Sequence, residues 1–176
     1  MNLLSDRAVA LRSWREEDLP SLLKLRNDQA LQEQLMTQPR SNTEDTVRQW
    51  LARRSSGPEN VFFVIEDTQR HEVAGYLQYT HMDSVNGTAE FGICIAPEFQ
   101  GQGHAAAAMT LAECYLREVF KGRKVVLKVF ADNTRAIRLY EKRGFEKCGL
   151  LKRQFLRQGM FQDVVIMEKF IKSPER

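Results

Sequence analysis

The stretch PEFQGQGHAAAA, residues 97–108, joins the end of a predicted strand to the start of a predicted helix. Gly101 and Gly103 lack side chains, so the backbone there can approach a ligand closely. The helix that follows leaves its first N–H groups unpaired, and its dipole adds partial positive charge at the same point. These features predict an anion-binding loop suited to a pyrophosphate. A glycine-rich turn that only caps a buried helix is the structural alternative.

Gly101, Gly103 and Ala106 also fit the G-x-G-x-x-G/A pattern of dinucleotide-binding proteins. That pattern requires successive βαβ units and an acidic residue about 20 positions later, at a strand end. The nearest acidic residue at a strand end is Asp132, which lies too far along the chain, and the preceding strands look like an antiparallel meander. A nicotinamide-binding protein is therefore a secondary alternative. A Walker loop is excluded, because no Gly-Lys-Ser/Thr follows.

Hydrophobic periodicity around this loop predicts an α/β fold. The expected elements are, in order, a strand at 9–11, a helix capped by Asp18, a helix at 30–36, a helix capped by Asn42 or Thr43, strands at 61–66, 73–80 and 88–96, a helix at 103–120 ended by Gly122, a strand at 125–130, a helix at 134–143 ended by Gly144, and a strand pair from 145 to 170 that turns near Gln158 and Gly159. Hairpin-joined strands followed by a βαβ unit predict a mixed sheet. A single domain over residues 1–176 is expected.

The composition is that of an ordinary globular chain: 176 residues, 43% hydrophobic and 28% charged, with a net charge of +3. That charge is too small to indicate nucleic acid and suits a small anionic ligand. Cys94, Cys114 and Cys148 are too widely spaced for a disulfide framework, which predicts reduced thiols and a cytoplasmic location. The histidines follow no metal-ligand pattern, so no metal is expected. Neither a signal peptide nor a membrane span is predicted.

Taken in context, the loop resembles the GNAT acetyltransferase superfamily. QGQGHA at 100–105 matches that family's Q/R-x-x-G-x-G/A pyrophosphate motif, AEFGICIAPEF at 89–99 looks like its splayed fourth strand, and ADNTRAIRLYEKRGFE at 131–146 looks like its second motif. The ending at 149–168 resembles the last hairpin of the subgroup with ribosomal-protein N-terminal and spermidine acetyltransferases. The resemblance covers nearly the whole chain. It implies a twisted, mostly antiparallel sheet flanked by helices, with acetyl-CoA as the acetyl donor.

The resemblance also implies which residues meet the cofactor. The loop takes the pyrophosphate, main-chain groups of the fourth strand take the pantetheine arm, and Asn133 contacts the same arm. The expected contacts are Ile93, Cys94, Ile95, Gln100, Gly101, Gln102, Gly103, His104, Ala105, Ala106 and Asn133. Asn133 has a helix N-cap as its alternative role. Cys94 is interpreted as a small strand residue rather than a nucleophile, because no histidine is placed to activate it.

Two residues are candidates for proton transfer. Tyr140 shares an inward helical face with Ala136 and Ile137, and the resemblance places it beside the thioester sulfur as general acid. A phenol, with a pKa of about 10, can donate to a departing thiolate. Glu90 is the candidate base, direct or through water, because an amine with a pKa of about 10.4 is almost fully protonated at neutral pH. A core aromatic and a solvent-facing glutamate are the respective alternatives.

The acceptor is the least determined feature. Residues 23–38, LKLRNDQALQEQLMTQ, are expected to line its site and resemble acetyltransferases of nucleotide-linked amino sugars. Arg26 is therefore a candidate contact for a phosphate or carboxylate, and Glu33 a second acceptor-side candidate. A protein N-terminus and a polyamine stay open, the latter less favoured because the segment has few carboxylates. A non-catalytic acyl-CoA-binding protein is the alternative of another class. The oligomeric state is left open, a homodimer included.

Overall fold

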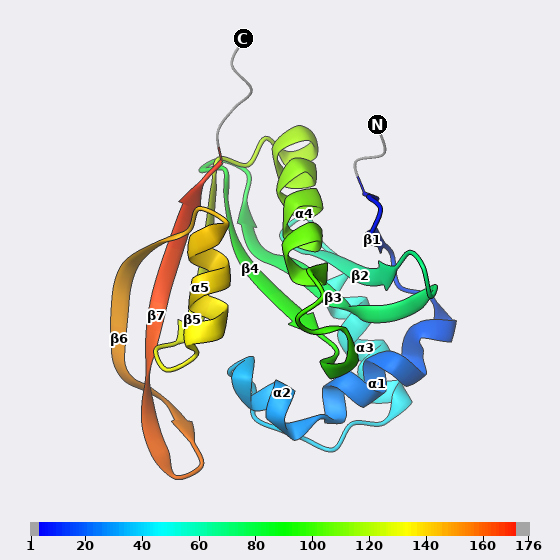
Figure 1. The fold of residues 1–176 in the computed structure, drawn as a ribbon, viewed down its shortest axis with the longest axis horizontal. Helices are drawn as coiled ribbons and strands as arrows, with labels where there is room; N and C mark the ends of the chain where they lie inside the picture. The colour runs from blue at the N-terminus through cyan, green and yellow to red at the C-terminus, as the bar shows by residue number, and fades with distance from the viewer. Residues whose placement is uncertain (1–3, 172–176) are drawn as a thin grey trace.

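The computed structural model describes residues 4–171, which form one seven-stranded sheet with helices on both faces (Figure 1). The strand order is β1-β2-β3-β4-β5-β7-β6. Neighbouring strands are antiparallel except β4 and β5, which are parallel. The predicted mixed and mostly antiparallel sheet is confirmed. The strands before the loop form a meander, so the βαβ frame of a dinucleotide-binding protein is absent from this part of the described chain.

The elements are β1 (Val9–Arg12), α1 (Leu19–Asn27), α2 (Gln29–Gln34), α3 (Glu44–Arg54), β2 (Val61–Asp67), β3 (Glu72–Asp83), β4 (Thr88–Ile95), α4 (His104–Phe120), β5 (Lys124–Phe130), α5 (Thr134–Lys142), β6 (Glu146–Arg157) and β7 (Met160–Phe170). Short 3₁₀ turns precede α1 at Glu16–Asp18 and α4 at Pro97–Phe99. β6 and β7 stay paired up to the turn, where Arg157 faces Met160.

The core lies on both faces of the sheet, since successive strand residues point to opposite sides. Phe62 of β2 contacts Trp50 of α3, with ring centroids 5.3 Å apart, whereas the next residue, Phe63, contacts Tyr115 of α4 at 5.1 Å. Figure 1 shows α4 and α5 on one face and α3 behind the other, with α1 and α2 at the end of the sheet beyond β4. The two faces therefore carry different helices, and this division organises the site.

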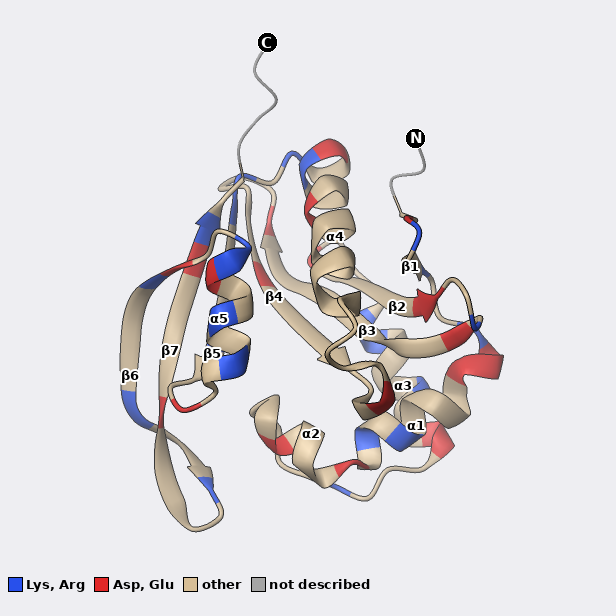
Figure 2. Ribbon diagram, viewed as in Figure 1, with Lys and Arg blue, Asp and Glu red and all other residues tan. Residues whose placement is uncertain are grey.

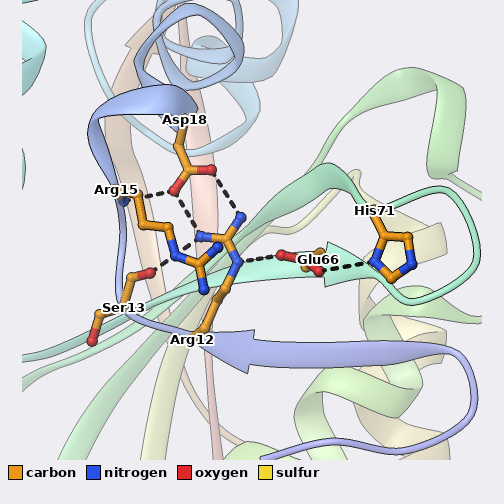
Figure 3. Close-up of polar contacts among 6 residues, drawn as sticks. All are labelled: Arg12, Ser13, Arg15, Asp18, Glu66 and His71. Atoms are coloured by element: carbon orange, nitrogen blue, oxygen red, sulfur yellow. Dashed lines mark hydrogen bonds and ion pairs between the residues drawn. The ribbon is translucent and has the colours of Figure 1, made fainter.

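Asp18 is the N-cap residue of α1, as predicted, but its side chain makes no capping hydrogen bond to the helix. Its carboxylate instead accepts hydrogen bonds from both terminal nitrogens of Arg12, each 2.8 Å long, and from the backbone N–H of Arg15 at 2.7 Å (Figure 3). The Nε of Arg12 donates to Glu66, which also lies 3.5 Å from His71. The hydrogen bond from Arg12 holds the pKa of Glu66 below its ordinary value. This network joins β1, β2 and the start of α1.

The other predicted helix ends have mixed outcomes. Thr43 caps α3 by accepting a hydrogen bond from the N–H of Thr46, and Gly144 has the expected left-handed φ of +85° after α5. The role given to Gly122 is wrong, because the left-handed residue after α4 is Lys121, with φ +54°. Gly122 is instead required by packing. A Cβ there would lie 2.7 Å from the side chain of Leu116.

Candidate active site

β4 and β5 begin side by side and then separate. They pair only where Thr88, Ala89 and Glu90 face Lys124, Val125 and Val126. Beyond that point β4 stays paired with β3 as far as Ile95, and β5 stays paired with β7 as far as Phe130. The two strands diverge toward the lower end of the sheet in Figure 1. Residues 91–95 therefore have no strand partner on the β5 side, so their main-chain groups there are available to a ligand.

A cavity of about 760 Å³ occupies this opening. Its size is typical of sites for small molecules and cofactors. One wall, here called the α4–α5 side, is formed by Phe99, Gln100, Gly101, Gly103, His104, Ala105, Ala106, Asn133, Arg135, Ala136, Leu139 and Tyr140. The opposite wall, the α1–α3 side, includes Arg26, Trp50, Arg54, Tyr76, Gln78, Thr80 and Glu90.

The glycine loop has the conformation that an anion site needs. Gly101 and Gly103 have left-handed φ values of +78° and +88°, and α4 begins directly after Gly103, which has no side chain to cap it. A Cβ on Gly103 would meet no atom of the described residues within 4 Å, so the space above it is open. The free N–H groups at the start of this 17-residue helix therefore face open space in the cavity. The positive end of the helix dipole points to the same space.

The loop glutamines stabilise the loop itself. Gln100 donates from Nε2 to the carbonyl of Ile95 at 3.0 Å and accepts from Arg135 at 3.2 Å. Gln102 donates to the carbonyl of Glu98 at 2.7 Å and does not line the cavity. A ligand contact from Gln102 would come from its main chain. Ala105 and Ala106 form the first turn of α4 at the cavity wall, where their small side chains leave room.

The side chain of His104 is turned into the protein. Its Nε2 lies 2.7 Å from Oδ2 of Asp67, and its ring packs edge-on against Phe99 at 5.3 Å. This hydrogen bond and those from backbone N–H groups hold the pKa of Asp67 below its ordinary value. The pair ties the first residue of α4 to the end of β2. A contact between His104 and a bound anion would therefore come from the backbone.

Along β4, Ile93, Cys94 and Ile95 all line the cavity. Cys94 is 3% exposed, and burial raises the pKa of its thiol to about 12. The thiol is therefore protonated near neutral pH and is a poor nucleophile. This agrees with the interpretation of Cys94 as a small strand residue rather than a nucleophile.

α5 contributes three cavity residues of interest. Asn133 caps this helix, because its Oδ1 accepts from the N–H of Ala136 at 3.1 Å, which leaves its NH₂ group for a ligand. Tyr140 lines the cavity with its ring 5.8 Å from that of Phe145, and burial raises its pKa to about 12. Figure 2 shows Lys and Arg along α5, and of these Arg135 reaches the cavity.

Glu90 lies on the opposite wall, at the point where β4 leaves β5. Its carboxylate is 3.4 Å from Nζ of Lys128 and 3.7 Å from Nδ1 of His81. The side chain is 35% exposed, so it is neither a core group nor a fully solvated one. Glu90 and Tyr140 thus face the opening from opposite sides of the sheet.

Arg26 lies at the base of the α1–α3 side. Its guanidinium stacks on Trp50, 4.7 Å from the ring centroid, and donates to Oε1 of Gln32 at 2.8 Å. Its Nε is buried without a hydrogen-bond partner among residues 4–171. Glu33 does not line the cavity. Its carboxylate accepts from Gln158 at 3.0 Å, which links α2 to the β6–β7 turn.

Sequence reasoning missed Arg54, Gln78 and Thr80, which also line this wall. Arg54 ends α3, and Gln78 and Thr80 lie on β3 opposite Gly92 and Glu90 of β4. Asn86-Gly87, between β3 and β4, is a typical sequence of a hairpin turn. Pairing the two strands across this turn places both β3 residues beside Glu90, and that pairing is the signal that would have found them.

Within residues 4–171 no group of three or more His, Cys, Asp or Glu side chains is arranged to hold a metal ion. Over the same residues, no helix is both long and apolar enough to cross a membrane.

Comparison with known proteins agrees with this geometry. Residues 8–146 match the family described as acetyltransferase (GNAT) domain. The chain is 28% identical to a spermidine N(1)-acetyltransferase of Vibrio cholerae over 171 residues, covering 95% of this chain and 98% of that protein. It is 24% identical to the ribosomal-protein-serine acetyltransferase of Escherichia coli, covering 77% and 74%. The crystal structure of the Vibrio cholerae spermidine N-acetyltransferase with CoA and spermine superposes with a TM-score of 0.87 at 27% identity, covering 94% and 97%.

Proposed function

Because the chain belongs to the acetyltransferase (GNAT) family and transfers an acetyl group from acetyl-CoA to an amine, we propose that its acceptor is a small primary amine that also carries an anionic group. A nucleotide-linked amino sugar is the leading example. The observation that carries this proposal is the charge of the cavity. Among its described lining residues Glu90 is the one carboxylate, against Arg26, Arg54, Lys128 and Arg135.

These cations divide into two groups. Lys128 lies beside Glu90 and Arg135 is bonded to Gln100 at the loop, so both have partners. Arg26 and Arg54 have no ion pair within residues 4–171. A partly buried guanidinium without a carboxylate is costly unless a ligand anion meets it, and a guanidinium matches phosphate and carboxylate geometry. A polycationic acceptor would meet repulsion from the same two side chains.

The proposed mechanism is direct attack of the amine on the thioester. The start of α4 binds the pyrophosphate of acetyl-CoA, and the unpaired main chain of β4 aligns the pantetheine arm. Glu90 accepts a proton from the ammonium, and the neutral nitrogen then forms a bond to the acetyl carbon. As the C–S bond breaks, Tyr140 donates its proton to the departing sulfur, and the new amide nitrogen releases its second proton to solvent.

The burial of Tyr140 fits this role. With a pKa of about 12, the phenol stays protonated throughout the neutral range and is always ready to donate.

Polyamine acetylation is the second candidate, and it is favoured by the similarity to the Vibrio cholerae enzyme, whose solved structure contains spermine. Acetylation of a protein N-terminus is supported by the weaker similarity to the ribosomal-protein-serine enzyme. Both would need carboxylates or a peptide groove on the α1–α3 side. Its described lining offers Glu90 alone as a carboxylate, which is why neither is preferred.

The proposal is tested by incubating a panel of amines with acetyl-CoA and measuring the rate at which the free thiol of CoA is released. The panel contains glucosamine phosphate, a UDP-linked amino sugar, unmodified glucosamine, spermidine and a peptide with a free N-terminus. We expect kcat/KM for the anionic amines to exceed that for unmodified glucosamine by about tenfold or more, as for a charge-assisted hydrogen bond. Spermidine as the best acceptor of the panel would overturn the proposal in favour of the polyamine alternative.

The single-domain organisation, the cytoplasmic location and the oligomeric state remain predictions. The dependence on acetyl-CoA and the three free cysteines, Cys94, Cys114 and Cys148, support a cytoplasmic location. Light scattering on the purified chain distinguishes a monomer from the homodimer that the sequence leaves open.

A further inference from the structure

Gln78 carries an unsatisfied polar atom on the acceptor side of the cavity. Its side chain lines the cavity, and its Oε1 is buried without a hydrogen-bond partner among residues 4–171. A buried amide carbonyl that is left unpaired costs free energy, and such atoms in folded proteins usually have a partner in a ligand or a bound water. Because the side chain of Gln78 lines the cavity, a ligand with an N–H or O–H donor is a candidate partner for this acceptor.

The strand register brings Gln78 close to Glu90. Gln78 faces Gly92 across the β3–β4 pair, and Thr80 faces Glu90. Gln78 and Glu90 are thus diagonal neighbours on one face of the sheet, a relation in which the residues lie roughly 7–8 Å apart. Both side chains are long enough to reach one nitrogen atom across such a separation.

The residue between them keeps this space open. A Cβ on Gly92 would lie 3.4 Å from Nε2 of Gln78, so the amide of Gln78 rests over the bare backbone of Gly92. Gly92 is also among the first residues of β4 beyond its pairing with β5, where the thioester is expected. The side chain of Gln78 lies on the face of β3 that packs toward α3, since its partner on β2, Phe62, contacts Trp50. It is therefore on the acceptor side and not on the side of the pyrophosphate loop.

We propose that Oε1 of Gln78 accepts a hydrogen bond from the attacking amine and positions it for Glu90 and the thioester. An ammonium has three N–H donors, of which one is given to Glu90 and one to Gln78. After Glu90 takes its proton, the N–H that is still held by Gln78 turns the free lone pair toward the acetyl carbon. The inference rests on acetyl transfer with Glu90 at the acceptor side, but not on the anionic group of the acceptor, because the amine is common to all candidates.

The test compares three proteins: the wild type, the variant Gln78→Met and the matched control Gln49→Met. The amine KM is measured for each with glucosamine phosphate and with spermidine, together with the affinity for CoA. Methionine keeps the length of the side chain and removes the acceptor, and Gln49 is exposed on α3 outside the cavity. We expect Gln78→Met to raise KM by about tenfold or more for each amine that is turned over, with the affinity for CoA within about twofold of wild type. Gln49→Met should leave both quantities unchanged.

Gln78→Glu provides the rescue. It restores an acceptor, so the amine KM should return to within about threefold of wild type. A purely structural role for Gln78 would not produce this rescue.

Two results would overturn the inference. An unchanged amine KM in Gln78→Met would show that the acceptor oxygen is not used, and an equal loss of CoA affinity would show that Gln78 serves the pantetheine arm. A binding measurement covers the case in which no amine of the panel is turned over and the proposed function fails. The Gln78 side-chain amide signal, assigned by its loss in Gln78→Met, should shift when glucosamine phosphate or spermidine is titrated into the CoA complex. A signal that moves with neither amine contradicts the proposal.

Discussion

The two walls of the cavity are built in different ways. On the α4–α5 side, the anion site depends on backbone conformation and on a helix start, and its residues lie together at 99–106 and 133–140. On the α1–α3 side, the contacts are side chains taken from α1, α3, β3 and β4, and Arg26 and Glu90 lie 64 positions apart along the chain. The α4–α5 side can be shared by any enzyme that uses the same acetyl donor. The α1–α3 side can change one side chain at a time, and we expect it to determine which acceptor is used.

Tyr140→Phe should have the largest effect and tests whether the α4–α5 side supplies chemistry as well as binding. Phenylalanine keeps the ring packing and removes only the O–H, so unfolding free energy should change by about 1 kcal/mol at most. Loss of the general acid should reduce kcat by roughly 10²-fold or more, with CoA affinity nearly unchanged. Turnover and CoA binding are measured on the same variant.

Tyr115→Phe is the matched control. Tyr115 lies on α4, packs against Phe63 of β2 and Phe120 of α4, and does not line the cavity. If Tyr140→Phe keeps wild-type kcat, Tyr140 is only a core residue and water protonates the sulfur.

Glu90→Gln should have the next largest effect, and its size should depend on pH. If Glu90 removes the proton of the amine, turnover should fall by about 10 to 10²-fold below the pKa of the amine and recover above it, where the amine is already neutral. The kcat/KM profile over pH 6 to about 10.5 measures this, with Glu72→Gln, exposed at the start of β3, as control. An equal loss at every pH would assign Glu90 to positioning alone, and no loss would return it to the solvent-facing alternative.

Gly103→Ala tests the anion loop by comparison with Gly159→Ala. Both glycines have left-handed φ values, +88° and +78°, and at both an added Cβ meets nothing within 4 Å in the described protein. The backbone strain is thus the same, about 1 kcal/mol, but only Gly103 faces the cavity. We expect CoA to raise the Tm of Gly159→Ala as in wild type, and to bind Gly103→Ala at least about tenfold more weakly. NAD should raise the Tm of neither, and equal CoA affinities would return the loop to a simple helix cap.

The same contrast explains what could be predicted from the sequence. The loop was found because its signal is local: two glycines, a strand end and a helix start within residues 97–108. The fold followed from periodicity and turn residues, and the opening of the sheet agrees with the strand that the family resemblance described. Neither inference needed to know which distant residues meet.

Contacts between residues distant in the chain decide what could not be predicted from the sequence. Asp18 was expected to cap α1, but a bidentate hydrogen bond from Arg12 of β1 occupies its carboxylate. Glu33 was placed at the acceptor site, but Gln158, which comes from the β6–β7 turn, holds it outside the cavity lining. Gln78 has no local motif at all, and its relevance depends on the β3–β4 register and on the absence of a side chain at Gly92.

Arg54→Gln should have the smallest effect and tests whether the α1–α3 side selects for charge. Arg54 is half-buried at the end of α3 and lines the cavity, while its neighbour Arg53 is exposed and does not, so Arg53→Gln makes the same charge change outside the site. A single cation near the rim of a cavity contributes modestly in water, so KM for glucosamine phosphate should rise by roughly three- to tenfold in Arg54→Gln and stay unchanged in Arg53→Gln. The difference should shrink at high salt, because exposed charges are screened. For spermidine the sign should reverse, since removing a cation relieves repulsion. An Arg54→Gln variant that binds both amines as wild type does would show that this wall does not select for charge, and would leave Arg26 as the remaining candidate for an anionic acceptor group.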